Sequence, residues 1–237
     1  MVDTIKKFVK SSFRIFGLDL ARLDPAELNK FVWLRNRNIN TILDVGANTG
    51  QFARMIHQAL PSAMIYSFEP LGDCYEELVM SMKDVRNFRA FKFALGGGQF
   101  ETHMHRSEFS PSSSILQMGE LHRQAFPQTS RTKEERISVR ALDDVVPDLE
   151  CDDNLLIKLD VQGYEDRVIN GARKVLARAS VLIVETSFER LYDDQPLFDA
   201  IFDMLRQLDY KYHGSLSQLR NPLDGSVLQA DSIFIKE

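Results

Sequence analysis

From residue 39 onward, short apolar runs alternate with segments in which apolar residues recur at i, i+3 and i+4. Short apolar runs are typical of buried β-strands, whereas the i, i+3, i+4 pattern is typical of a helix with one buried face. The strand-like runs cover residues 42–45, 64–68, 88–95, 137–140, 155–159, 181–184 and 232–235. The helix-like segments cover residues 52–60, 75–82, 168–179 and 197–208. This alternation predicts an α/β fold with a mostly parallel sheet and helices on both faces.

Two segments depart from the alternation. The stretch 99–136 is polar, weakly patterned and rich in serine near residues 111–114. A long insertion of this kind in a compact domain is more often functional than structural, so we expect it to shape a ligand site. Near the end of the chain, a turn at 221–225 precedes the strand-like run 232–235, which predicts a terminal antiparallel pair.

The chain is therefore expected to hold an N-terminal helical extension (1–38) and one domain (39–237). Within the extension, basic and apolar residues interleave between positions 5 and 16. One interpretation is a basic amphipathic helix that rests on an anionic membrane surface. The other, which we favour because few residues are basic, is a helix that packs on the domain or on a second subunit of a homo-oligomer.

The composition narrows the classes of protein. The net charge of -5 argues against a nucleic-acid-binding protein, which normally has a basic face. The sequence shows neither an apolar run long enough to span a membrane nor a secretion signal. Cys74 and Cys151 lie far apart and form no metal-binding spacing. We therefore expect a cytoplasmic protein with reduced thiols.

Acidic residues follow several of the predicted strands. Asp44, Glu69, Asp160 and Glu185 each lie at the carboxyl end of a strand-like run. In open α/β sheets, ligands bind beyond these ends. Four carboxylates at one edge of the sheet suggest a site that holds hydroxyls, an amine or a cation.

The turn after the first strand indicates what one ligand is. It consists of Gly46, Ala47, Asn48, Thr49 and Gly50. Its glycines allow a ligand to approach the backbone at the start of the next helix. Asn48 and Gln51 stand where a dinucleotide-binding turn has glycines, which weakens the case for NAD. The turn suits a zwitterionic amino acid whose ammonium group meets Asp44. Glu69, after the second strand, is placed to accept hydrogen bonds from two ribose hydroxyls.

Several motifs together resemble the FkbM family of S-adenosylmethionine-dependent methyltransferases. They are LDVGANTG at 43–50, FEP at 68–70, Ser113 and Ser114, VRALDD at 139–144, IKLDVQGYE at 157–165, NGA at 170–172, Val184–Glu185 and LQAD at 228–231. The resemblance implies a Rossmann-like, seven-stranded sheet with an antiparallel last strand. It also implies S-adenosylmethionine as the cofactor and methyl transfer to a hydroxyl of a sugar, glycan or natural product. Ser113 and Ser114 are then expected to touch the cofactor or the acceptor.

Asp160 is expected to hold or deprotonate the acceptor hydroxyl, because a hydroxyl is a poor nucleophile until its oxygen is activated. Lys158 shares its strand face and would stabilise developing negative charge, or it forms a buried ion pair. Asp160 and Glu185 could instead ligate Mg²⁺ with Thr186, an interpretation we consider weaker. Two other functions stay open: an NAD-dependent oxidoreductase and a non-catalytic cofactor-binding scaffold.

Overall fold

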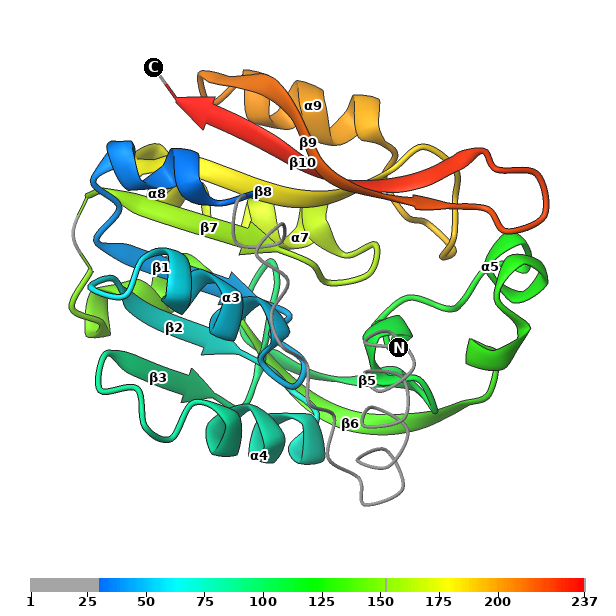
Figure 1. Ribbon diagram of the computed structural model, residues 1–237. Helices are drawn as coiled ribbons and strands as arrows, with labels where there is room; N and C mark the ends of the chain where they lie inside the picture. Colours follow the sequence, from blue (N-terminus) through cyan, green and yellow to red (C-terminus); the bar gives the residue numbers. More distant parts are fainter. Residues whose placement is uncertain (1–29, 152, 237) are drawn as a thin grey trace, which may run out of the picture.

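The computed structural model describes residues 30–151 and 153–236, which form a seven-stranded sheet flanked by helices (Figure 1). The strand order is β3-β2-β1-β7-β8-β10-β9. The first five strands are parallel, and β10 runs antiparallel to β8 and β9. The strands are β1 Thr41–Val45, β2 Met64–Phe68, β3 Phe88–Phe91, β7 Leu155–Leu159, β8 Ala179–Ser187, β9 Tyr210–Arg220 and β10 Val227–Lys236. The predicted fold class and the terminal antiparallel pair are confirmed.

A second, three-stranded sheet corrects two sequence predictions. Its order is β4-β6-β5, with β4 Ala94–Leu95, β5 Phe100–Ser107 and β6 Thr132–Arg140. The run 88–95, predicted as one strand, therefore divides between two sheets. The insertion 99–136, predicted to be irregular, contains β5 and part of β6. Most side chains of β5 and of residues 132–136 in β6 are exposed or half-buried, so these parts have no apolar alternation that the sequence could display.

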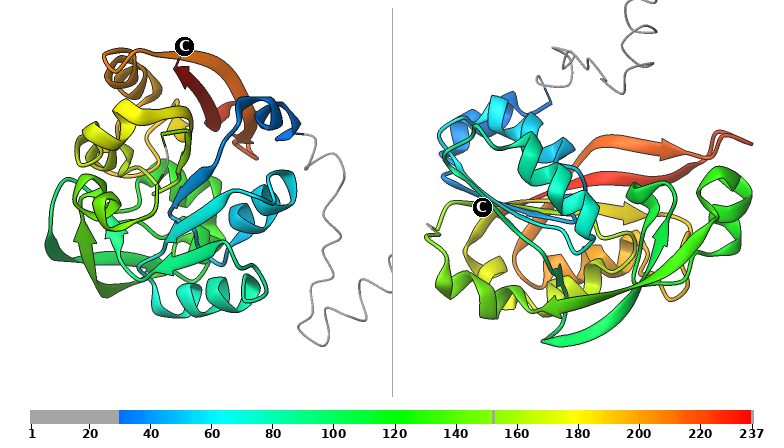
Figure 2. Two further views of the ribbon diagram at one scale, coloured as in Figure 1. Left: turned by 90° about the vertical axis from the view of Figure 1, so that its left-hand side faces the viewer. Right: turned by 90° about the horizontal axis from the view of Figure 1, so that it is seen from below.

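Helices cover both faces of the large sheet (Figure 2). They are α3 Gln51–Ala59, α4 Gly72–Ser81, α5 Glu120–Ala125, α6 Leu142–Val145, α7 Glu165–Asn170, α8 Arg173–Arg178 and α9 Phe198–Arg206. The short 3-10 helices are η1 Val32–Arg37, η2 Ser110–Ser112, η3 Pro127–Thr129 and η4 Val146–Asp148. Side chains from η1, α3 and α4 pack with Ile42 and Ile65 on one face, and side chains from α6 to α9 pack with Leu43 and Tyr66 on the other. All five residues of β1 are buried, as a central strand requires.

The predicted helix 168–179 is interrupted between α7 and α8. At the interruption, a Cβ on Gly171 would lie 1.9 Å from the carbonyl oxygen of Gly96. Asp143 accepts hydrogen bonds from the backbone amides of Lys174 and Val175, at 3.0–3.1 Å. These amides begin α8 and have no partner within the helix. The LDD motif at 142–144 thus has a structural role in starting α8.

The predicted extension 1–38 falls mostly outside the described residues, and so does the amphipathic stretch at 5–16. The described part, residues 30–38, includes η1 and buries Phe31 and Leu34 against the α3 face. Among the residues that the structure describes, no helix is long and apolar enough to cross a membrane.

Candidate active site

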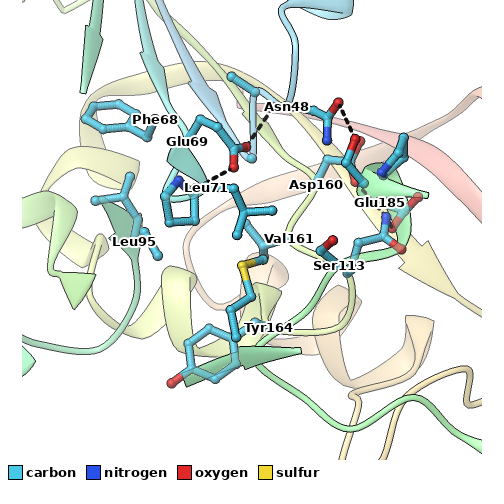
Figure 3. Close-up of a pocket in the computed structure, with 18 of the residues that line it drawn as sticks. Asn48, Phe68, Glu69, Leu71, Leu95, Ser113, Asp160, Val161, Tyr164 and Glu185 are labelled. Atoms are coloured by element: carbon cyan, nitrogen blue, oxygen red, sulfur yellow. Dashed lines mark hydrogen bonds between the residues drawn. The ribbon is translucent and has the colours of Figure 1, made fainter. Parts of the chain in front are cut away.

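The carboxyl ends of β1, β2, β7 and β8 surround a cavity of about 230 Å³. Apolar side chains, including Phe68 and Leu95, line one side, and Asp160 and Glu185 lie on the other (Figure 3). The strand order explains this division, because β2 lies on one side of β1 whereas β7 and β8 lie on the other. The cavity therefore joins an apolar compartment to a polar one across the turn that follows β1.

That turn approaches the end of β7 very closely. Gly46 has φ +82°, and a Cβ on it would lie 1.9 Å from the carbonyl oxygen of Asp160. Gly50 also has a positive φ, and α3 begins directly after it. The amides of Gly46 and Ala47 donate to the carbonyl of Phe68, at 3.0 and 3.1 Å. These two amides are therefore occupied, and the first turn of α3 is left to offer amides to a ligand.

Asp44 lies behind the turn and does not line the cavity. It is fully buried on β1, where one oxygen accepts a hydrogen bond from Ser67 Oγ at 3.1 Å. The other oxygen, Oδ1, has no hydrogen-bond partner among the described residues. Burial raises the pKa of Asp44 to about 6, while neighbouring Lys158 acts in the opposite direction. Such an orphaned buried oxygen fits a site that a cationic group or an ordered water completes.

Glu69 lies in the cavity wall, with both carboxylate oxygens held by the backbone (Figure 3). Oε1 accepts from the amide of Leu71 at 2.9 Å, and Oε2 accepts from the amide of Asn48 at 2.8 Å. Burial raises the pKa of Glu69 to about 7, although these two hydrogen bonds favour the charged form. The carboxylate is thus fixed in orientation beside the apolar compartment.

Lys158 and Asp160 form an ion pair at the polar end, as their spacing on one strand predicted. Lys158 Nζ lies 2.6 Å from Asp160 Oδ2 and 5.4 Å from the centroid of the Phe52 ring. Burial favours the neutral amine, but the carboxylates of Asp160 and Asp44 outweigh it and raise the pKa of Lys158. The lysine is therefore charged and neutralises part of the acidic cluster.

Gln162, which belongs to the IKLDVQGYE motif, links the two carboxylates. Its Nε2 donates to Asp160 Oδ1 at 2.9 Å and to Glu185 Oε2 at 2.7 Å. Its Oε1 lies 2.9 Å from the hydroxyl of Tyr192, which is buried. The backbone of Gln162 is left-handed, with φ +54°. No pattern in the sequence indicated Tyr192, because this contact joins residues thirty positions apart.

The side-chain amide of Gln162 also argues against a Mg²⁺ ion bound by Asp160 and Glu185. The amide nitrogen of Gln162 lies between Asp160 and Glu185, where a cation would have to bind both. Thr186 instead bonds Ser232 Oγ at 2.7 Å and lies buried in the sheet. Among the described residues, no three His, Cys, Asp or Glu side chains group as metal ligands. The donor set in this arrangement does not fit Mg²⁺.

The serines of the insertion have different positions. Ser113 lines the cavity, and its Oγ accepts from the amide of Ser107 at 3.1 Å. Ser114 lies outside the lining residues and donates to the carbonyl of Gln162 at 2.7 Å. Ser114 therefore contacts the site through the backbone of Gln162.

Comparison with known proteins identifies the chain. A family model described as the methyltransferase FkbM domain matches residues 44–212. The chain belongs to the FkbM family of methyltransferases. The 2-O-methyltransferase NoeI of Sinorhizobium fredii (strain NBRC 101917 / NGR234) is 28% identical to this FkbM-family chain over 194 residues, which cover 79% of the chain and 77% of NoeI. The solved structure of TehB from Haemophilus influenzae has the same fold, with a TM-score of 0.50, 8% identity, and coverage of 96% of this chain and 67% of TehB.

This FkbM-family enzyme uses S-adenosylmethionine as its methyl donor. The site fits that cofactor in three ways. Gly46 leaves room that a Cβ would fill, Asp44 has an orphaned oxygen, and Glu69 presents an oriented carboxylate. Membership of this family therefore argues against the two alternative functions, an NAD-dependent oxidoreductase and a non-catalytic scaffold.

Proposed function

We propose that this enzyme methylates a hydroxyl group on a sugar, glycan or other small natural product. The observation that supports this most strongly is the similarity to NoeI, which is named a 2-O-methyltransferase. The polar end of the cavity is consistent with a hydroxylated acceptor, because Asp160, Gln162 and Glu185 offer hydrogen bonds there. In this proposal the acceptor lies on the β7–β8 side of the turn.

The cofactor would occupy the opposite side. Glu69 would accept hydrogen bonds from the ribose hydroxyls, and the apolar residues beside it would hold the adenine. The methionine end would lie at the turn, with Asp44 below it as the counter-charge for the ammonium group. The proposed cofactor-binding residues are Asp44, Gly46, Ala47, Asn48, Gly50, Glu69, Ser113 and Ser114.

When bound, S-adenosylmethionine supplies a methyl group on a sulfonium that an oxygen nucleophile can displace. The protein must then place the acceptor oxygen in line and exclude water, and correct placement provides much of the rate. We assign Asp160 to position the acceptor at the polar end of the cavity. Lys158, charged and 2.6 Å from Asp160, would keep that carboxylate ionised and stabilise negative charge on the oxygen.

The experiment that tests this function uses tritiated S-adenosylmethionine and a panel of methyl pyranosides with free 2-hydroxyls. Each pyranoside is paired with its 2-deoxy counterpart as a matched control. We expect label in at least one 2-hydroxyl sugar and none in its 2-deoxy partner. Calorimetry with S-adenosylhomocysteine runs in parallel, so that a protein that binds cofactor yet labels no hydroxyl would reject the acceptor class alone.

We further propose that the enzyme acts in the cytoplasm on a small-molecule or glycan acceptor. Neither Cys74 nor Cys151 forms a disulfide, which is consistent with a reducing compartment. Fractionation of cells that express the tagged chain would test this location. If the chain is found in a membrane fraction and high salt releases it, the result would favour the alternative that residues 5–16 rest on an anionic membrane surface.

A further inference from the structure

The two carboxylates at the polar end of the cavity differ in how their oxygens are occupied. Asp160 has one oxygen on Lys158 and the other on Gln162. Glu185 has only Oε2 occupied, by Gln162 at 2.7 Å and by Gln229 at 3.1 Å. Its Oε1 has no hydrogen-bond partner among the described residues, and it is not sealed from solvent. Since Glu185 lines the cavity, this oxygen is available to a ligand.

We infer that Glu185 is the general base of the methyl transfer and accepts the proton of the acceptor hydroxyl on Oε1. This inference rests on the proposed function, because it needs a hydroxyl acceptor. It adds a role that the strand-end pattern did not assign to Glu185. It also leaves Asp160, paired with Lys158, to position the acceptor and not to take its proton.

The other titratable groups of the cavity are less suited to that step. Glu69 has a backbone amide on each oxygen and lies at the apolar compartment. The Tyr164 hydroxyl has a raised pKa, mainly because of burial, and so keeps its proton at neutral pH. No histidine lines the cavity within the described chain, and β5 directs Met104 toward it in place of His103 and His105. Glu185 is the remaining oxygen base at the acceptor end.

The surroundings of Glu185 also make it a stronger base than an exposed glutamate. Burial raises its pKa first, and the charges of Asp160, Glu165 and Asp231 raise it further. Lys158 acts in the opposite direction. These groups lie on β7 or directly after it, at the start of α7 and on β10, around the end of β8. A carboxylate with a raised pKa binds a proton more strongly than an exposed one, which suits general base catalysis.

Gln162 and Gln229 act as positioning residues for this base. Both donate to Oε2, so the carboxylate is fixed in orientation and neither amide occupies Oε1. Gln229 also contacts Ser187 Oγ at 3.2 Å, and Gln195 donates to the same oxygen at 2.7 Å. Side-chain amides keep their donors at every pH, so this support persists whether Glu185 is charged or neutral.

The acceptor oxygen forms a bond to the methyl carbon, and the bond between that carbon and sulfur breaks. The sulfur retains the electron pair and becomes a neutral thioether. The hydroxyl proton moves to Glu185 Oε1 and leaves to solvent after the product departs. No oxidant, reductant or further reactant is needed.

The test compares Glu185→Gln with the wild-type enzyme on the methyl pyranoside that the wild type labels fastest. The substitution is nearly isosteric and still presents an oxygen to Gln162 and Gln229, so the fold and cofactor affinity should be kept. We expect kcat to fall by about 10²–10⁴-fold, the usual contribution of general base catalysis. The rise of kcat with pH in the wild type should disappear, while the Kd for S-adenosylhomocysteine stays unchanged.

Glu77→Gln, an exposed glutamate on α4, is the matched control and should behave as wild type. Glu185→Asp, with its carboxylate withdrawn by one methylene, should lower kcat but keep the pH-dependent rise. A Glu185→Gln enzyme with normal kcat, or with the rise intact, overturns the assignment of the base. If Glu185→Gln no longer binds the cofactor, the pH profile of Glu185→Asp tests the assignment instead. A kcat of Glu185→Asp that does not depend on pH also overturns the assignment of Glu185 as the base. A wild type that labels no hydroxyl rejects the proposed function and this inference with it.

Discussion

Gly46 and Asp160 meet backbone to backbone, so closely that a Cβ on the glycine would lie 1.9 Å from the aspartate carbonyl oxygen. The contact joins the turn after β1 to the end of β7. Because Gly46 lies at the proposed cofactor site and Asp160 at the proposed acceptor site, the two sites share one rigid boundary. The alignment of donor and acceptor thus depends on the absence of a side chain at position 46.

Gly46→Ala is expected to weaken both folding and cofactor binding. The left-handed backbone would destabilise an alanine by about 1 kcal/mol. The clash of its Cβ with the carbonyl of Asp160 would destabilise the fold further by displacing β7. Gly225→Ala is the matched control, because Gly225 has φ +78° and nothing within 4 Å of a Cβ. Urea unfolding should show a loss of about 1 kcal/mol in the control and a clearly larger one in Gly46→Ala. Equal losses would show that the backbone contact has no energetic role.

Glu69→Gln should weaken binding of S-adenosylhomocysteine by about 10- to 100-fold, since hydrogen bonds to a charged group contribute about 1.5–3 kcal/mol. The glutamine amide also has only one acceptor oxygen, so its NH₂ group faces the backbone N–H donor of either Asn48 or Leu71. Calorimetry at pH 8, above the pKa of about 7, compares ionised Glu69 with the variant. Glu76→Gln on the exposed side of α4 is the control. An unchanged Kd in Glu69→Gln would exclude the ribose contact.

Glu165 was part of the family motif in the sequence, but its role is evident only in the structure. It is buried, and its Oε1 accepts from the amides of Val161 and Gly163, at 3.1 and 3.2 Å. It therefore shapes the turn that presents Gln162. Burial raises its pKa to about 7, although these hydrogen bonds act in the opposite direction.

This shift predicts a pH dependence of stability. A carboxyl group with a raised pKa keeps its proton in the folded state while the unfolded chain releases it, so stability falls as pH rises from about 4.5 to 7. Glu165→Gln keeps the acceptor for both amides and removes the titration. Urea unfolding of the ligand-free proteins should show that the wild type loses stability relative to Glu165→Gln between pH 5 and about 8, on the order of 3 kcal/mol at most. Buried groups away from Glu165, including His122, titrate equally in both proteins and cancel, whereas Glu185 has a lower pKa in Glu165→Gln because the charge of Glu165 is removed. Parallel pH curves would contradict the prediction.

The sequence could predict the parts of the site that depend on strand periodicity. Lys158 and Asp160 share a face because side chains alternate along a strand, and the 2.6 Å ion pair confirms it. Convergence of strand ends correctly brought Asp160 and Glu185 to one cavity. Periodicity could not show that Asp44 lies behind the turn, because that depends on the close approach of β7 to Gly46.

Contacts between distant segments could not be predicted either. Tyr192 reaches Gln162 from the loop after β8, and its hydroxyl also lies 3.1 Å from the carbonyl of Ser112 in the insertion. One hydroxyl proton serves one of these two oxygens at a time. Likewise, the sequence did not indicate that His122 is buried, with its ring 5.2 Å from that of Tyr192. A short helix such as α5 has too few turns to display which side is buried.

Removal of divalent metal should leave methyl transfer unchanged. Gln162 Nε2 donates to both Asp160 and Glu185, so Mg²⁺ could bind the pair only by displacing that amide and leaving Tyr192 without an acceptor at Gln162. The measurement is labelling of the best pyranoside in excess EDTA, with and without added Mg²⁺. Calorimetric titration of Mg²⁺ into the complex with S-adenosylhomocysteine provides a readout that needs no acceptor, and it should detect no saturable binding. Activity that EDTA abolishes and Mg²⁺ restores would instead mean that Gln162 swings aside in the working enzyme and that the two carboxylates are metal ligands.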